Sequence, residues 1–183
     1  GAHEDGETVP VTIIDSLPLP VCHFIKIDVE GMEADVLDGA RKTITKHNPA
    51  LYVENDRREK SPGVIERLLT AGYRLFWHIP RLYNADNFFA NAENVFGETA
   101  SLNMICFPKN LEQNVTGLSE ISSPDDWPVQ RLRFRAIRIN QLASKKPSQS
   151  WCLIIAINFR VKIRDALLWF LIQQYISEFG GRA

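Results

Sequence analysis

The chain has 183 residues, 45% of them hydrophobic, with 21 Lys and Arg against 22 Asp and Glu for a formal net charge of −1. This length suits one sizeable core rather than two full domains, and the near-zero charge excludes a protein steered to nucleic acid by its overall field. The three cysteines are widely spaced and form no Cys-x-x-Cys or Cys/His pattern. They predict a reduced, cytoplasmic protein without a structural zinc site.

The first elements in chain order are an apolar segment over 11–14, a proline-rich turn over 15–20 and a buried strand over 24–29. The helical rhythm of the following apolar residues predicts a helix over 31–47, stopped by Asn48 and Pro49. The next apolar run, residues 50–54, predicts a second buried strand.

In a second helix, Ser61 and Pro62 are predicted as the N-cap and first helical position, and Gly72 as the stop. A third strand over 74–79, an aromatic and Asn-rich loop over 82–96 and a fourth strand over 102–107 follow. The alternation of strand and helix predicts a parallel α/β sheet with right-handed crossovers.

The stretch IKIDVEGMEADVLDGA, residues 25–40, ends its strand in Asp, Glu and Gly at once. In open α/β sheets, ligands bind outside the carboxyl ends of the strands, where Asp28 and Glu30 would lie. Carboxylates are also favoured at helix N-termini, so helix capping explains the same residues. Both interpretations stay open from position alone.

The composition changes near Pro108, because residues 1–108 carry a net charge of −6 and residues 109–183 a net charge of +5. A polar connection over 110–128 leads to RLRFRAIRI, residues 131–139, which alternates cationic and apolar side chains as a half-exposed strand does. The apolar run WCLIIAINF, residues 151–159, is too short for the roughly 20 residues of a membrane-spanning helix. We therefore expect no transmembrane segment.

Four segments together carry a family resemblance: IKIDVEGMEADVLDGA, PALYVEND, AGYRLFWHIPRLYNADNF and SLNMICFP. They resemble the C-terminal half of FkbM-type methyltransferases, which use S-adenosylmethionine and are associated with O-methylation. The resemblance covers about residues 11–108, the expected methyltransferase part. Residues 109–183 remain a linker and a basic, apolar tail of unassigned fold.

The resemblance implies a class I methyltransferase fold, a Rossmann-like, doubly wound α/β sheet in which the strand over 24–29 is the fourth strand. It implies methyl transfer from S-adenosylmethionine to a hydroxyl acceptor, a small molecule or glycan such as a sugar or polyketide. Asp28 would be catalytic and lie beside the cofactor's methyl group, with Glu30 supporting it from the turn. The residues expected to border the acceptor pocket are Glu54, His78, Asn87 and Asn103, with Asn84 and Asn55 nearby.

Orientation dominates the expected mechanism. Positioning of the reactants can lower the barrier by roughly 7 to 11 kcal/mol. General-base help typically accelerates a reaction by about 10²- to 10⁴-fold, which corresponds to a smaller decrease in the barrier. We therefore expect Asp28 to aim the hydroxyl as a hydrogen-bond acceptor, with proton removal coupled to attack.

The chain departs from the family in its glycines, which nowhere form GxGxG or GxG, and only about 24 residues precede the fourth strand. The first cofactor-binding strands are therefore expected to be missing, leaving a truncated domain that is inactive alone or dependent on a missing half. The edge of the strand over 24–29 would be bare. The segment over 131–139, the segment over 151–159 or a partner chain would have to cover it.

An alternative is a non-enzymatic α/β module whose basic tail binds an anionic membrane surface, nucleic acid or a partner chain. A solvated strand face explains the same cations equally well, and nucleic acid is not the favoured partner. The tail residues proposed to contact such a partner are Arg131, Arg133, Arg135, Arg138, Lys145 and Lys146.

Overall fold

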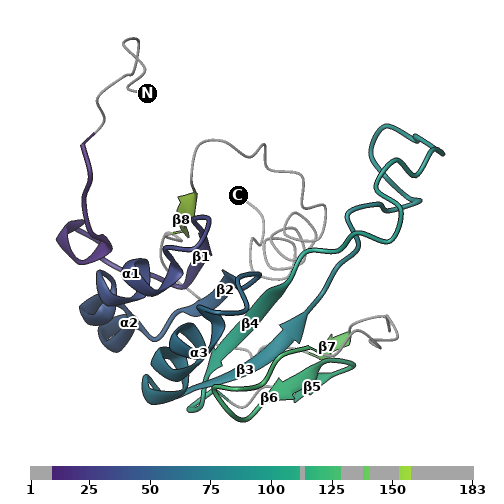
Figure 1. The fold of residues 1–183 in the computed structure, drawn as a ribbon. Coiled ribbons are helices and arrows are strands. Elements are labelled where there is room, and N and C mark those ends of the chain that lie inside the picture. The colour runs from purple at the N-terminus through teal and green to yellow at the C-terminus, as the bar shows by residue number, and fades with distance from the viewer. Residues whose placement is uncertain (1–9, 112–113, 129–137, 141–152, 158–183) are drawn as a thin grey trace.

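The computed structural model describes residues 10–111, 114–128, 138–140 and 153–157. Its centre is a six-stranded sheet with the order β6-β3-β4-β2-β1-β8, beside a two-stranded ribbon of β5 and β7 (Figure 1). The strands are β1 (Phe24–Asp28), β2 (Ala50–Glu54), β3 (Tyr73–His78), β4 (Asn103–Pro108), β5 (Asn114–Thr116), β6 (Ser119–Ile121), β7 (Arg138–Asn140) and β8 (Leu153–Ile157).

The helices of the described residues are η1 (Ile14–Ser16), a short 3-10 turn, and α1 (Glu33–Asp38), α2 (Arg41–His47) and α3 (Ser61–Thr70). The three α-helices gather on one side of the sheet (Figure 1), where Leu37, Ile44 and Leu68 join one large apolar cluster with the inward residues of the strands. A smaller cluster around Tyr52 and Phe76 lies on the other face. The mixed α/β class predicted from the sequence is confirmed.

Strand directions follow the connections between the strands. β1 and β2, which are joined through α1 and α2, pair in parallel as predicted. β4 pairs antiparallel with both β2 and β3, so β3 runs parallel to β2 with β4 between them. The strand–helix alternation therefore gives parallel strands, whereas β4 reverses because a loop, and no crossover helix, joins it to β3.

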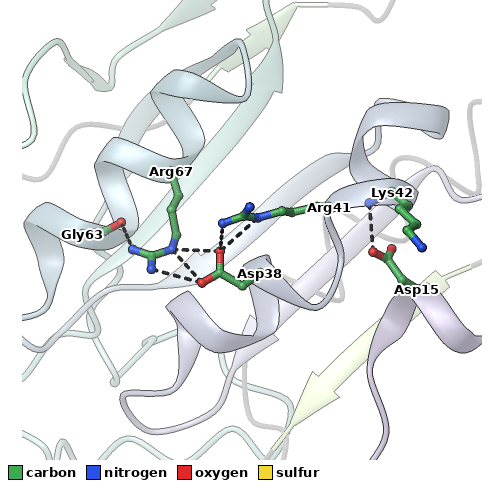
Figure 2. A network of polar contacts seen from close by, with 6 residues as sticks. All are labelled: Asp15, Asp38, Arg41, Lys42, Gly63 and Arg67. Atoms are coloured by element: carbon green, nitrogen blue, oxygen red, sulfur yellow. Dashed lines mark hydrogen bonds and ion pairs between the residues drawn. The ribbon is translucent and has the colours of Figure 1, made fainter.

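The single helix predicted over 31–47 is wrong in one respect, since α1 ends at Asp38 and α2 begins at Arg41. The segment around η1 explains the break. The N–H of Asp15 donates to the carbonyl of Gly39 at 2.9 Å, and the Asp15 carboxylate accepts from the backbone N–H groups of Lys42 and Thr43. A side chain far away in the sequence thus satisfies the first N–H groups of α2 (Figure 2).

Asp38 joins the three helices to one another. Its carboxylate accepts hydrogen bonds from Arg41 at the start of α2 and from Arg67 of α3 (Figure 2). The predicted N-cap role of Ser61 is also corrected, because the cap position of α3 is Lys60 and Ser61 lies inside the helix. The Ser61 hydroxyl instead accepts a hydrogen bond from the buried Asn55 amide at 2.8 Å.

Segments after residue 108 complete both edges of the sheet. β6 pairs with β3 at one edge, and β8 pairs in parallel with β1 at the other, from Phe24 opposite Leu153 to Asp28 opposite Ile157. The expectation that the tail covers the β1 edge is therefore confirmed for the segment over 151–159. β7, at the end of the segment over 131–139, pairs with β5. Within the described residues, no helix is long and apolar enough to cross a membrane.

Candidate functional site

Four predicted site residues form one row across the sheet. Ile27 is opposite Val53, so Asp28 and Glu54 follow at the same level of β1 and β2. The row continues because Asn103 of β4 is opposite both Glu54 and His78. Their sequence neighbours on each strand pack on the helix side, so strand alternation places the row on the opposite face. Across the sheet, the order of the row is Asp28, Glu54, Asn103 and His78.

Asp28 is held by an ion pair within its own strand. Its Oδ2 lies 3.0 Å from Nζ of Lys26, whose side chain is only 5% exposed while that of Asp28 is 19% exposed. A buried ammonium requires a paired anion, and a spacing of two residues on a strand supplies one on the same face. The Asp28 carboxylate is therefore oriented while part of it still reaches solvent.

Glu54 is the neighbouring carboxyl on β2. Its burial, followed by the negative charge of Asp28 and a hydrogen bond with Asp28, raises the pKa of Glu54 to about 8. Smaller contributions come from Asp56 and Glu30. The raised pKa favours the protonated form of Glu54 beside the Asp28 carboxylate.

The His78 end of the row is sealed inside the protein. His78 and Asn103 are both buried; Nδ1 of His78 lies 2.9 Å from Oη of Tyr52, and the Asn103 amide donates to Ser101 Oγ at 2.8 Å. Burial lowers the pKa of His78 to about 4, so its imidazole is neutral at physiological pH. His78 and Asn103 therefore form the buried end of the row, and the carboxyls of Asp28 and Glu54 form its more accessible end.

Glu30 lies in the turn after β1 and outside the row. It has a left-handed backbone with φ of 55°, followed by Gly31 at 94°, and its exposed carboxylate pairs with Arg57 at 2.8 Å. The N–H of Gly31 donates to the buried Glu33 carboxylate at 2.9 Å. The helix N-terminus of α1 has no side-chain cap, since the Glu33 carboxylate binds the turn before the helix, and Glu30 forms the turn that leads away from Asp28.

Asn87 is not brought to the row. It belongs to the loop between β3 and β4, which projects beyond the ends of the strands (Figure 1). Its amide donates to the carbonyls of Asn84 and Asn91, and its Oδ1 accepts from the Asn91 N–H. The side-chain hydrogen bonds of Asn87 therefore shape this loop, and those of Asn84 do the same through Asp86.

Two residues next to the row were not predicted from the sequence. Lys26 and Tyr52 lie two positions before Asp28 and Glu54 on the same face of the sheet. The sequence contained a signal for Lys26. A lysine within an apolar run, two residues before an aspartate, predicts an ion pair on one face when the period of two is applied.

The Asp28 carboxylate, which is partly exposed, complements the positively charged sulfonium of S-adenosylmethionine. The rest of the cofactor finds no fit among the described residues. A Cβ on Gly31, the glycine of the turn after β1, would meet Lys60 Nζ at 3.1 Å, so its space is taken by this chain's own lysine. Nor do three His, Cys, Asp or Glu side chains converge in this part of the chain to hold a metal ion.

The cations of the alternative interpretation fall mostly beyond what the structure describes. Arg131, Arg133, Arg135, Lys145 and Lys146 lie outside the described residues, and only the backbone of Arg138 is placed, in β7. The binding role of the basic tail stays a prediction.

Residues 2–75 of the chain match the family described as methyltransferase FkbM domain. The match confirms the resemblance to FkbM methyltransferases and ends within β3, so it contains Asp28, Glu30 and Glu54 but not His78, Asn87 or Asn103. No curated protein and no solved structure matches the chain.

Proposed function

We propose, from the FkbM domain match over residues 2–75, that this chain is the acceptor-side part of an S-adenosylmethionine-dependent O-methyltransferase. The observation that carries the proposal is the carboxyl pair of Asp28 and Glu54 at the ends of two adjacent parallel strands, with Asp28 partly open to solvent. Ligands of open α/β sheets bind outside such strand ends.

The acceptor is a hydroxyl compound, and S-adenosylmethionine, when bound, would supply an electrophilic methyl group and leave as S-adenosylhomocysteine. The Asp28 carboxylate would accept a hydrogen bond from the hydroxyl and aim its oxygen at that methyl group, beside the Glu54 carboxyl. As the new carbon–oxygen bond replaces the carbon–sulfur bond, the hydroxyl proton would pass to the Asp28 carboxylate. Orientation contributes most, since well-placed reactants gain roughly 7 to 11 kcal/mol.

The proposal retains the class I methyltransferase architecture for the whole enzyme, with the cofactor-binding turn supplied from outside the described residues. Support comes from β1 and β2, whose parallel pairing and carboxylate-terminated ends are compatible with a Rossmann-like sheet. We expect the chain alone to bind S-adenosylmethionine more weakly than about 100 μM, roughly −5.5 kcal/mol.

The first test is calorimetric titration of the purified chain and of Asp28→Ala with S-adenosylmethionine. Binding tighter than about 100 μM would overturn the truncated-domain proposal, because the chain would then hold the cofactor without an added half. Weak binding is followed by amide chemical shifts at millimolar cofactor. Shifts at Asp28 and Glu54 that disappear in Asp28→Ala are expected, whereas no shifts at the row would count against the methyltransferase site.

A further inference from the structure

Lys26 and Asp28 form a buried ion pair on the face of the sheet away from the helices. The ammonium lies 3.0 Å from the carboxylate, and the Lys26 side chain is only 5% exposed. Taking an ammonium out of water is costly unless an anion compensates it. The Asp28 carboxylate is therefore the anion that compensates the buried ammonium of Lys26.

Glu54 places a second carboxyl beside this ion pair. Two carboxyls that share one site do not both ionise readily, because like charges repel in a poorly solvated environment. The surroundings of the two members differ, since the Lys26 ammonium lies 3.0 Å from Asp28 Oδ2, whereas Glu54 pairs with no cation among the ion pairs of the described residues. This asymmetry decides which carboxyl holds the proton.

We propose that Lys26 is the positioning residue of this site: its ammonium fixes the negative charge of the carboxyl pair on Asp28 and leaves the proton on Glu54. The meaning of this arrangement for catalysis rests on the proposed function. The proton distribution itself is a property of the free chain and can be measured without cofactor or acceptor.

Among the described residues, the other charged groups around the pair do not produce the same asymmetry. Glu30 and Asp56 add negative charge near Glu54, but Arg57 lies 2.8 Å from Glu30 and 3.4 Å from Asp56. On the far side of the row, His78 is neutral and hydrogen-bonded to Tyr52. On the outer side of β1, the paired strand β8 has the sequence LIIAI, which contains no titratable residue.

An acceptor would therefore meet a carboxylate that is held in one orientation. Nζ of Lys26 lies 3.0 Å from Oδ2 of Asp28, and the Asp28 side chain remains 19% exposed. Neutral Glu54 adds no second negative charge to compete for the same donor.

The test is a pH titration of the Asp28 and Glu54 side-chain carboxyls by ¹³C NMR in the full chain, without ligand. Lys26→Met removes the ammonium, and we expect the proton affinity of the carboxyl pair to rise by about tenfold or more, since an opposite charge within hydrogen-bonding distance favours ionisation. Lys26→Arg keeps the charge and should restore the wild-type titration. Lys46→Met makes the same charge change on the exposed side of α2 and should leave the titration as in the wild type.

A Lys26→Met titration equal to that of the wild type would overturn the proposal. If Lys26→Met does not fold, Asp28→Asn provides the second arm, because the charge of Asp28 helps to raise the pKa of Glu54. We expect the proton affinity of Glu54 to fall by about tenfold in Asp28→Asn. An unchanged Glu54 would refute the shared-proton pair. If methyl transfer fails while these titrations behave as expected, only the proposed function is lost.

Discussion

Tyr52 on β2 reaches across β4 to place its hydroxyl 2.9 Å from Nδ1 of His78 on β3. Both side chains are buried, and their rings lie at 58° to one another with centroids 5.7 Å apart. The contact connects the two strands on either side of β4 and keeps the imidazole at the inner end of the row.

Acid should weaken the protein through His78. Burial lowers the pKa of His78 from 6.5 to about 4, so the unfolded chain takes up a proton there before the folded chain does. Stability is therefore fully present above pH 6.5 and is lost as the pH falls from 6.5 towards 4, by up to about 3 kcal/mol. Urea unfolding at pH 7 and 4.5 should show a smaller loss for His78→Gln than for the wild type.

Tyr52→Phe separates burial from hydrogen bonding in the same pair. It keeps the buried imidazole, so the pH dependence should persist, but we expect a cost of about 1 to 3 kcal/mol at every pH from the lost partner. Equal pH dependence in wild type and His78→Gln would show that His78 is not the group responsible.

Asp15→Ala should destabilise the protein although the residue lies outside every α-helix. Its carboxylate accepts hydrogen bonds from the N–H of Lys42 and from the N–H and hydroxyl of Thr43. Losing such a cap costs about 1 to 2 kcal/mol, which chemical denaturation can measure. Asp125→Ala, at an exposed site, should change stability by less than about 0.5 kcal/mol and serves as the control.

The same cap gives a pH dependence. Burial acts to raise the pKa of Asp15, but the hydrogen bonds from Lys42 and Thr43 outweigh it and lower the pKa below 3.8. The stabilisation is present above pH 3.8 and disappears as the pH falls through the lower folded value. The difference between wild type and Asp15→Ala should therefore shrink in strong acid, and a constant difference would argue against the cap.

Glu30 offers a test of backbone strain in the turn after β1. A non-glycine residue with φ of 55° costs roughly 1 kcal/mol, which glycine does not incur. Glu30→Gly and Glu30→Ala both remove the carboxylate that binds Arg57, so their comparison isolates the backbone. We expect Glu30→Gly to be more stable by about 1 kcal/mol in thermal unfolding. Equal stabilities would mean that this turn relaxes.

The β1–β8 pairing should protect the chain from self-association. Ile155 is opposite Lys26 in the middle of the parallel pair, and proline disrupts a strand interior because it lacks an N–H and has a fixed φ. Ile155→Pro should expose the β1 edge and give dimers or larger species in size-exclusion chromatography with light scattering. Ile155→Val keeps the backbone donor and should elute as the wild type does. A monomeric Ile155→Pro would show that β8 is dispensable.

The sequence predicted much of the fold because the local patterns are strong. The strand over 50–54 is confirmed as β2, and the stops at Asn48 and Gly72 follow from left-handed backbone at both positions. The break between α1 and α2 could not be predicted, because it depends on Asp15, which is distant in the sequence. The antiparallel direction of β4 could not be predicted either, because it depends on which strands β4 pairs with in the folded sheet.

For the candidate site, the residues at the strand ends could be predicted from the sequence, but the contacts that surround them could not. Asp28 and Glu54 follow apolar runs, so their neighbouring positions could be anticipated. Lys26 and Asp28 are two residues apart and so lie on the same face of β1, and prediction of their ion pair depends on that alternation of faces. The burial of His78 depends on which segments cover it, and its own strand sequence does not show this. Asn87 was expected at the acceptor pocket from the family resemblance, which does not tell where the side chains of a long loop point in this chain.

The pairing of β1 with β8 also affects how the chain is made. Phe24 finds its partner Leu153 only after a further 129 positions of chain have been added. At a synthesis rate of about 5 to 20 residues per second, roughly 6 to 26 s pass between the synthesis of β1 and that of β8, and the outer edge of β1 has no β8 partner during this time. Loop closure over such a distance is slow as well. Among the described strands, the strand that carries Asp28 therefore gains its outer neighbour last.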